Sequence, residues 1–270
     1  MRVLLIGGNH PRHLYYMNRI ASHPGVEVSG ALIQNRGEMQ PEPPQGTPAH
    51  DAQLWHRHFK ARDERERAYF SPMRQPYKPL RVSADELSGP AAAGYVLTHP
   101  AELCLIFGTG MIRDPLASAL PDMTLNLHLG LSPRYRGAAT LFWPFYFLEP
   151  NHAGTTLHRI TAEPDAGEIL HQSRPKLITG DTIHDVACRA VVQATADMLA
   201  LLDRWPDWTF KKQRNTGKCF LARDFQPAHL RGIYDVWDDV IVDAYLNGEI
   251  VNAEPVLYRD NLKGDDNGNS

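Results

Sequence analysis

The feature that most constrains the fold of this chain is a series of short, almost wholly apolar runs closed by turn residues. The first run is RVLLIGG at residues 2–8, and similar runs follow at residues 26–34 and 101–111. A strand that is apolar at nearly every position is covered on both faces, which is typical of a parallel sheet. Leu14, Met17 and Ile20 recur at threefold spacing after the first run and predict a helix there. The β-α-β opening therefore predicts an α/β fold.

Later segments extend this pattern and then depart from it. Residues 123–129 and 153–161 read as further strands, and the apolar period near 3.6 from Asp181 to Leu202 predicts a long helix. Beyond Trp205 the sequence becomes aromatic and turn-rich, which predicts short strands, and residues 229–248 then predict an amphipathic helix. Its apolar stripe could dock on its own domain or on a partner.

We therefore expect a main domain over residues 1–205, interrupted by a helical insertion at about 36–99. A small α+β extension over residues 206–262 and a disordered tail over 263–270 should follow. The insertion could cover a binding pocket or mediate self-association, so a homodimer stays open.

Composition excludes several classes of protein. The chain is 43% hydrophobic and 22% charged, which is ordinary for a globular protein, and its net charge of -3 predicts no nucleic-acid partner. Cys104, Cys188 and Cys219 are far apart and odd in number, which predicts free thiols in a reducing compartment. No apolar run approaches the roughly 20 residues of a membrane span. The expectation is a cytoplasmic protein that does not enter the membrane.

Three polar residues stand out against this apolar framework. Asn126 and His128 lie two residues apart on one predicted strand, so their side chains share a face. Asp165 follows a later strand in the turn sequence EPDAGE. In open α/β sheets, ligands bind beyond the carboxyl ends of the strands. These three residues are therefore the candidate catalytic group.

Their chemistry suits transfer of an acyl group to an amine. An amide such as Asn126 and an imidazole such as His128 can stabilise the negative charge that develops on a carbonyl oxygen under attack. A carboxylate such as Asp165 can accept the proton that the amine loses. No GxSxG elbow or similar nucleophile motif is found in the sequence. Direct attack through a tetrahedral intermediate therefore fits better than a covalent enzyme intermediate.

The motifs N-L-H (126–128), S-P-R-Y-R-G (132–137) and G-x-T-x-H…D-A-G-E-I-L resemble a known family. They are similar to the formyltransferases that use 10-formyltetrahydrofolate, including the sugar N-formyltransferases, glycinamide ribonucleotide transformylase and the catalytic domain of methionyl-tRNA formyltransferase. The resemblance covers roughly residues 103–202. It implies a Rossmann-like, mostly parallel twisted sheet flanked by helices, with 10-formyltetrahydrofolate as formyl donor. It also implies that Asn126 binds the formyl oxygen, His128 stabilises the tetrahedral intermediate and Asp165 assists proton transfer.

The same resemblance implies binding residues outside this group. The pteridine of the folate would lie in the loop after the preceding strand, at Gly108, Thr109, Gly110, Met111 and Ile112. Glycines there let the main chain approach a flat ring. The acceptor phosphate of the ribonucleotide enzymes would match Gly8 and Asn9, at a helix N-terminus. Tyr135 and Arg136 could bind the acceptor or the folate tail, or Arg136 could simply pair with a carboxylate to hold its loop. His158 is either a core residue or a support for the site.

The acceptor follows from the resemblance less directly. Residues 206–270 are too few and too acidic for the basic barrel of the tRNA enzymes, which favours a small-molecule amine, above all an amino sugar on a nucleotide. A formyl-folate hydrolase, another one-carbon or acyl transferase of this fold, and a catalytically silent folate- or nucleotide-binding module stay open as alternatives. His10 and His13 lack companion ligands, so no metal is predicted, and neither Gly-rich loop matches the dinucleotide fingerprint.

Overall fold

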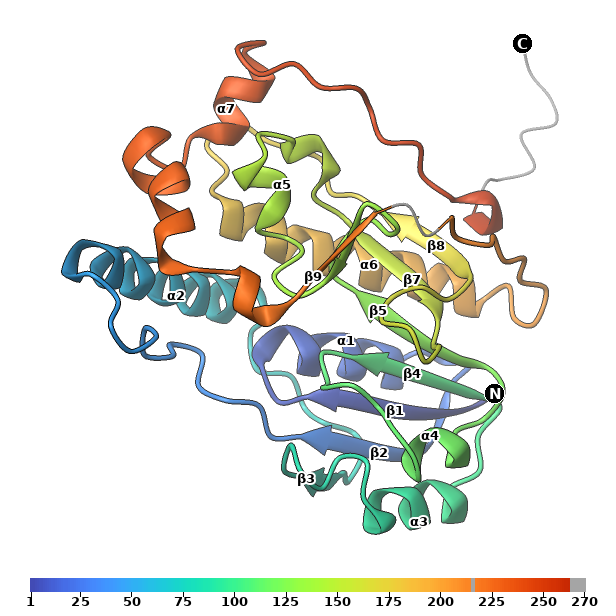
Figure 1. Ribbon diagram of the computed structural model, residues 1–270. Helices are drawn as coiled ribbons and strands as arrows, with labels where there is room; N and C mark the ends of the chain where they lie inside the picture. The colour runs from blue at the N-terminus through green and yellow to red at the C-terminus, as the bar shows by residue number, and fades with distance from the viewer. Residues whose placement is uncertain (215–216, 263–270) are drawn as a thin grey trace, which may run out of the picture.

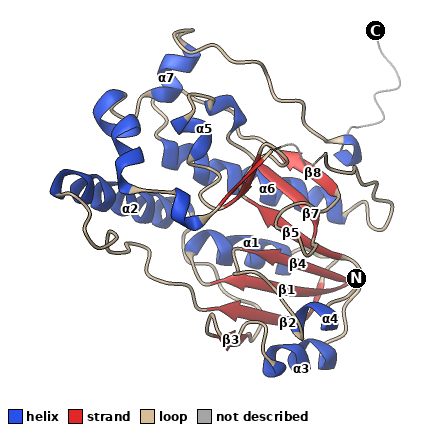
Figure 2. Ribbon diagram, in the orientation of Figure 1, coloured by secondary structure: helices blue, strands red, loops and turns tan. Residues whose placement is uncertain are grey.

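The fold is built around a seven-stranded sheet in the order β3-β2-β1-β4-β5-β7-β8 (Figures 1 and 2). The computed structural model describes residues 1–214 and 217–262. Strands β1 to β5 run parallel, β7 pairs antiparallel with β5, and β8 pairs antiparallel with β7, so only β7 runs against the other strands of this sheet. The strands are β1 (Arg2–Gly8), β2 (Glu27–Gln34), β3 (Leu80–Val82), β4 (Leu103–Phe107), β5 (Thr124–His128), β7 (Thr155–Arg159) and β8 (Ile169–Ser173). The predicted α/β fold with a mostly parallel sheet is confirmed.

Helices cover both faces of this sheet. The helices are α1 (Pro11–Ala21), α2 (Ala49–Tyr69), α3 (Pro90–Thr98), α4 (Leu116–Ala119), α5 (Trp143–Tyr146), α6 (Ile183–Leu202) and α7 (Ile241–Leu246). Side chains alternate across a strand, so Leu5 and Leu105 pack with α1 and α6, while Leu4 and Ile106 pack on the α3 side. Ile106 pairs with Asn126 in the sheet, and the flanking Leu125 and Leu127 belong to the α1 and α6 core. Asn126 and His128 therefore face the α3 side of the sheet.

The start of α6 is fixed by two carboxylates. Thr182 caps the helix and forms a capping box with Asp185. The Asp239 carboxylate also accepts a hydrogen bond of 3.1 Å from the main-chain N–H of Ile183. Burial raises the pKa of Asp239 to about 6. The C-terminal extension is thus joined to the helix that borders the sheet's carboxyl edge.

This contact explains where the prediction for residues 229–248 was wrong. In place of one helix, the structure has a π-helical turn at Gly232–Val236 and the separate α7. Asp238 and Asp239 lie between them with φ angles of 43° and 60°, which no α-helix accommodates. The sharp turn delivers the Asp239 carboxylate to α6.

A second apolar core joins the extension to the rest of the chain. Ile233 and Ile241, from the predicted stripe, are buried there against Trp143 and Phe145 of the α5 region. Leu54, Trp55 and Phe59 of α2 belong to the same core. The stripe therefore docks on its own chain. Figure 1 shows α2, α5 and α7 grouped beyond one end of the large sheet.

Short elements account for the remaining differences from the sequence analysis. The insertion contains β3, and β8 is a strand that the sequence analysis left unassigned after the turn at Asp165. A separate two-stranded sheet joins β6 (Tyr135–Gly137) to β9 (Lys218–Phe220). Cys104, Cys188 and Cys219 are free thiols. The expected tail over 263–270 lies outside the described residues.

No helix within residues 1–214 and 217–262 has the length and apolar character needed to cross a membrane.

Candidate active site

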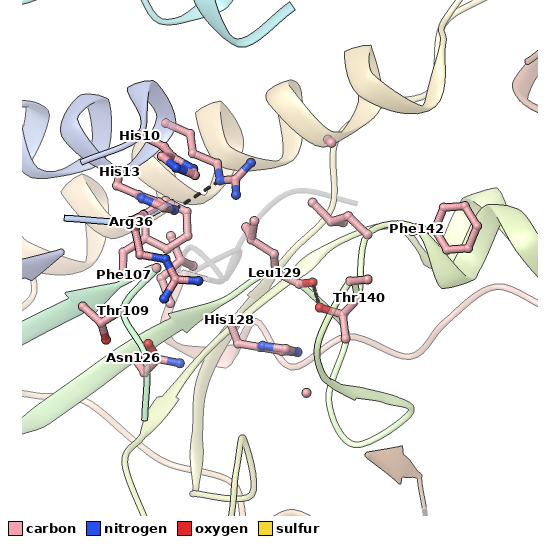
Figure 3. A pocket seen from close by; sticks show the side chains of 18 of the residues that line it. His10, His13, Arg36, Phe107, Thr109, Asn126, His128, Leu129, Thr140 and Phe142 are labelled. Carbon is pink, nitrogen blue, oxygen red and sulfur yellow. Dashed lines mark hydrogen bonds between the residues drawn. The ribbon is translucent and has the colours of Figure 1, made fainter. Parts of the chain in front are cut away.

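A large cavity opens at the carboxyl ends of β1, β4 and β5. Its volume is about 720 Å³, and Asn126, His128 and Asp165 all line it. Figure 3 shows Asn126 and His128 with the side chains of His10, His13 and Arg36 above them. The position matches the rule that ligands of open α/β sheets bind beyond the strand ends. The structure therefore brings the three predicted catalytic residues together.

Hydrogen bonds and ion pairs connect the three residues. Nδ1 of His128 lies 3.3 Å from Oδ2 of Asp165, and Nδ2 of Asn126 lies 3.5 Å from Oδ1. The other ring nitrogen of His128, Nε2, is 2.9 Å from the carbonyl oxygen of Tyr135. A carbonyl only accepts, so Nε2 carries a hydrogen. Nδ1, facing the carboxylate, is therefore the nitrogen free to take up a proton.

His158 is a fourth member of this group. Its Nε2 lies 3.3 Å from Oδ1 of Asp165 and 3.3 Å from Nδ2 of Asn126. Its Nδ1 donates to the carbonyl oxygen of Arg159, 2.8 Å away. The sequence left His158 as either a core residue or a support for the site, and the structure places it in contact with Asn126 and Asp165, which favours the second interpretation.

The electrostatic balance keeps Asp165 ionised and His128 neutral at rest. Burial would raise the pKa of Asp165, but the neighbouring rings of His158 and His128 and the hydrogen bond from the N–H of Gly137 outweigh it and lower that pKa to about 2. Burial lowers the pKa of His128, and the Asp165 carboxylate only partly opposes that effect. The pair is thus a carboxylate beside a neutral imidazole, which together can accept one proton.

The loop that carries Asp165 is held in an uncommon conformation. Asp165 has a φ of 50°, and its Oδ2 accepts from the N–H of Gly137 at 2.9 Å. Gly137 has a φ of 91°, and a Cβ built there would lie 2.1 Å from the carbonyl oxygen of Phe220. Gln213 donates from Nε2 to the carbonyl oxygen of Asp165 at 3.0 Å. A side chain at position 137 would collide with Phe220, so a glycine is needed there for the main-chain N–H to reach the Asp165 carboxylate.

The residues that line the cavity come from two parts of the fold, the loops after β4 and β7 and the region around α1, α2 and α6. The loop lobe is formed by Gly108, Thr109, Gly110, Met111 and Ile112 with Ile160, Thr161 and Pro164. The helix lobe lies toward α1, α2 and α6 and is formed by His10, Arg12, His13, Arg36, Glu38, His58, Phe59, Arg62, Glu66, Ile183, His184 and Cys188. Asn126, His128 and Asp165 line the same cavity as both lobes.

The loop lobe contains every residue predicted to bind the pteridine. Met111 is 40% exposed, and Ile112 packs partly against the core on the α3 side. Gly108 has a φ of 75°, and a Cβ there would lie 2.1 Å from the His13 ring. Gly110 donates its N–H to Oε1 of Gln34 at 2.7 Å. The lobe thus offers an accessible apolar wall to a flat aromatic ring, while the space beside Gly108 is filled by the His13 ring and the Gly110 N–H is bound to Gln34.

The helix lobe gathers three guanidinium groups. Arg12 and Arg62 both approach Glu66, whose side chain is almost fully buried, and the Arg12–Glu66 hydrogen bond is direct. Arg36 has no side-chain hydrogen bond or ion pair within the described part of the chain. Burial and the neighbouring Arg12 lower the pKa of Arg36. This lobe therefore presents positive charge that the surrounding side chains leave incompletely compensated.

The four residues predicted to bind the acceptor are not among those that line the cavity. Oδ1 of Asn9 accepts from the main-chain N–H of Arg36, and the ring of His13 lies against Gly8. Tyr135 donates its hydroxyl to Glu149, and Arg136, almost fully buried, pairs with Glu163 at 2.8 Å. Of the two readings of Arg136, the loop-holding ion pair is the one observed.

The helix-lobe residues were missed by the sequence analysis. Arg36, Arg62, His58 and His184 lie in different segments with no shared motif, so no local signal marked them. His10 and His13 were considered only as metal ligands. Among the described residues, no cluster of three or more His, Cys, Asp or Glu side chains is arranged to hold a metal ion.

Comparisons with known proteins agree with this architecture. Residues 39–201, more than half of the chain, match the formyl transferase family. A sugar N-formyltransferase from a Shewanella species superposes with a TM-score of 0.55 at 18% identity, over 83% of this chain and 78% of that one. Phosphoribosylglycinamide formyltransferase from Anaplasma phagocytophilum gives 0.53 at 16% identity, over 82% and 97%.

A third solved structure carries ligands. The N-formyltransferase from Helicobacter canadensis, in complex with folinic acid and dTDP-3-aminofucose, gives a TM-score of 0.51 at 16% identity, over 84% of this chain and 73% of that one. At these identities the structural likeness establishes the fold.

Proposed function

The chain belongs to the formyl transferase family, and we propose that it moves a formyl group from 10-formyltetrahydrofolate to a primary amine on a nucleotide-linked amino sugar. The observation that carries this proposal is the convergence of Asn126, His128 and Asp165 in one cavity that both lobes line. Direct transfer of a one-carbon group needs such a site, because the donor's formyl carbon and the acceptor's amine must be held next to each other and next to the catalytic residues.

The formyl donor is assigned to the loop lobe. A pterin is flat and hydrogen-bonds along one edge, and residues 108–110 line the cavity beside Met111 and Ile112. The Helicobacter canadensis relative binds folinic acid, a formylated tetrahydrofolate. With the pterin there, the donor's formyl group would reach Asn126 and His128 at the junction of the lobes.

The acceptor is assigned to the helix lobe. Arg12, Arg36 and Arg62 favour an anionic ligand, and guanidinium groups bind phosphates with paired, charge-assisted hydrogen bonds. The Helicobacter canadensis relative binds an amino sugar linked to a nucleoside diphosphate. A substrate with phosphates beside the arginines would leave its amine directed toward the catalytic group.

The catalytic group would act on the attacking amine and on the formyl oxygen. As the amine nitrogen bonds to the formyl carbon, the carbonyl oxygen becomes negative and accepts a hydrogen bond from Nδ2 of Asn126. The amine proton passes to Asp165 or to Nδ1 of His128. An imidazolium at His128 would be held between the Tyr135 carbonyl and the Asp165 carboxylate, beside that oxygen. The bond from the formyl carbon to N10 then breaks, and N10 takes a proton.

Product analysis tests the function directly. Purified protein is incubated with 10-formyltetrahydrofolate and dTDP-3-aminofucose, other nucleotide-linked amino sugars, glycinamide ribonucleotide or a free amino sugar. Tetrahydrofolate and formylated amine should form in equal amounts with a nucleotide-linked amino sugar. Release of formate without a formylated amine would identify a hydrolase, and binding of folate without turnover of any amine would identify a silent binding module.

A further inference from the structure

Three polar side chains from distant parts of the chain meet behind the helix lobe. Nδ1 of His58, on α2, lies 2.9 Å from the hydroxyl oxygen of Tyr234 in the C-terminal extension. The same oxygen lies 3.4 Å from Nε2 of His184, in the first turn of α6. The centroids of the two imidazole rings are 4.6 Å apart. All three side chains are about 95% buried, with exposures of 5–6%.

One ring nitrogen of His58 is left for the cavity. His58 and His184 line the helix lobe, whereas Tyr234 does not. Nδ1 of His58 is bound to Tyr234, and its Nε2 has no hydrogen-bond partner among the described residues. Nε2 keeps some accessible surface, and His58 lines the cavity. The His58 ring is therefore held with Nδ1 on Tyr234 and with Nε2 as its nitrogen available to the binding space.

Burial keeps the group uncharged. It lowers the pKa of His58 well below the usual value, and it lowers that of His184 to about 3 with help from Arg62. Burial also raises the pKa of Tyr234, so the phenol keeps its proton. The Tyr234 hydroxyl can donate to one imidazole and accept from the other. The direction of that hydrogen-bond chain decides whether Nε2 of His58 donates or accepts toward the cavity.

We propose that His58 is an acceptor-binding residue whose Nε2 hydrogen-bonds an uncharged hydroxyl, carbonyl or amide group of the acceptor, and that Tyr234 and His184 fix its ring orientation and tautomer. The inference rests on the proposed function, because it takes the helix lobe as the acceptor side. It makes the C-terminal extension a part of acceptor selection. The apolar neighbours Phe59, Phe142 and Phe225, which also line the cavity, exclude water from this hydrogen bond.

Two substitutions at His58 separate a binding role from a structural one. In His58→Gln the side-chain amide reaches the place of Nε2 and loses the bond to Tyr234. In His58→Asn it keeps the place of Nδ1 and loses the cavity-facing atom. With dTDP-3-aminofucose as acceptor, or the nucleotide-linked amino sugar that the wild type formylates fastest, His58→Asn should raise the acceptor KM about tenfold. His58→Gln should raise it about threefold, and the KM for 10-formyltetrahydrofolate should stay unchanged in both.

Tyr234→Phe tests the positioning role with an isosteric change. It should raise the acceptor KM about threefold without changing the donor KM, and ¹⁵N NMR should show a changed tautomer balance at His58. His56→Gln, at an exposed position on the same helix, and Tyr245→Phe, in the same extension, are the matched controls and should match the wild type.

The outcomes distinguish this inference from the proposed function. A larger acceptor KM in His58→Asn than in His58→Gln supports it, and so does a selective effect of Tyr234→Phe. The inference alone is overturned if the wild type formylates the amino sugar and all three variants have the kinetic constants of the wild type. It is also overturned if the variants raise the acceptor KM and the donor KM equally. A wild type that formylates no amine overturns the proposed function and this inference with it.

Discussion

The loop lobe and the helix lobe meet at the same catalytic group but are assembled in different ways. The loop lobe comes from one turn after β4 and one after β7, each a few residues long. The helix lobe combines the start of α1, Arg36, the middle of α2 and the start of α6, with the extension behind them. The contrast indicates that the loop lobe is set by local chain geometry and the helix lobe by tertiary packing.

Substitutions in the catalytic group should therefore change kcat, and substitutions in one lobe should change the KM of one substrate. The largest effects should come from the catalytic group. Asn126→Ala and Asp165→Ala should each lower kcat by at least about two orders of magnitude, because each removes a group that acts on the reacting atoms. Steady-state rates of tetrahydrofolate release measure this. Retained turnover in the double variant would contradict the assigned roles.

The next largest effect should come from a substitution that changes the backbone near the catalytic group. Gly137→Ala places a Cβ against the Phe220 carbonyl oxygen and displaces the N–H that Asp165 accepts. We expect kcat to fall more than about tenfold, because that hydrogen bond orients the carboxylate.

Gly46→Ala is the matched control for this change. Gly46 has a φ of 82° but open space around the missing Cβ, so its substitution tests backbone strain alone. It should lower the melting temperature slightly and leave kcat unchanged. Equal losses of kcat in the two alanine variants would show that the contact with Asp165 is unimportant.

Charge in the helix lobe should affect only the acceptor. Arg36→Met removes a guanidinium with no ion pair in the described chain, and the KM for a nucleotide-linked amino sugar should rise about tenfold. The acceptor KM should also become less sensitive to salt. The control is Arg67→Met, which removes an exposed arginine that pairs with Asp63 on α2. It should leave the KM values of the acceptor and of the donor unchanged. A rise in the donor KM in Arg36→Met would mean that the lobes are assigned the wrong way round.

The smallest effect concerns protonation. His128 should titrate below its ordinary pKa of about 6.5 when followed by ¹⁵N NMR, because burial disfavours the imidazolium. The Asp165 carboxylate opposes this shift, so Asp165→Asn should lower the pKa of His128 further. A pKa of His128 that rises in Asp165→Asn would contradict the electrostatic coupling between the two side chains.

The sequence allowed prediction of what local patterns determine. The apolar runs predicted β1, β2, β4, β5 and β7, and the spacing of Asn126, His128 and Asp165 within known motifs predicted one site. Long-range contacts were not predictable. The break at Asp238 and Asp239 depends on α6, and the group of His58, His184 and Tyr234 joins residues up to 176 positions apart. No periodicity records such contacts, because each segment by itself has ordinary helical or turn-rich sequence.

A crystal structure with folinic acid and dTDP-3-aminofucose bound together would test the two-lobe account most directly, because neither compound is consumed by the other at a useful rate. The account predicts the pterin against Met111 and Ile112, the phosphates beside Arg36, and the amine near Asn126 and His128. Folinic acid in the helix lobe, or an acceptor amine far from Asn126, would contradict it.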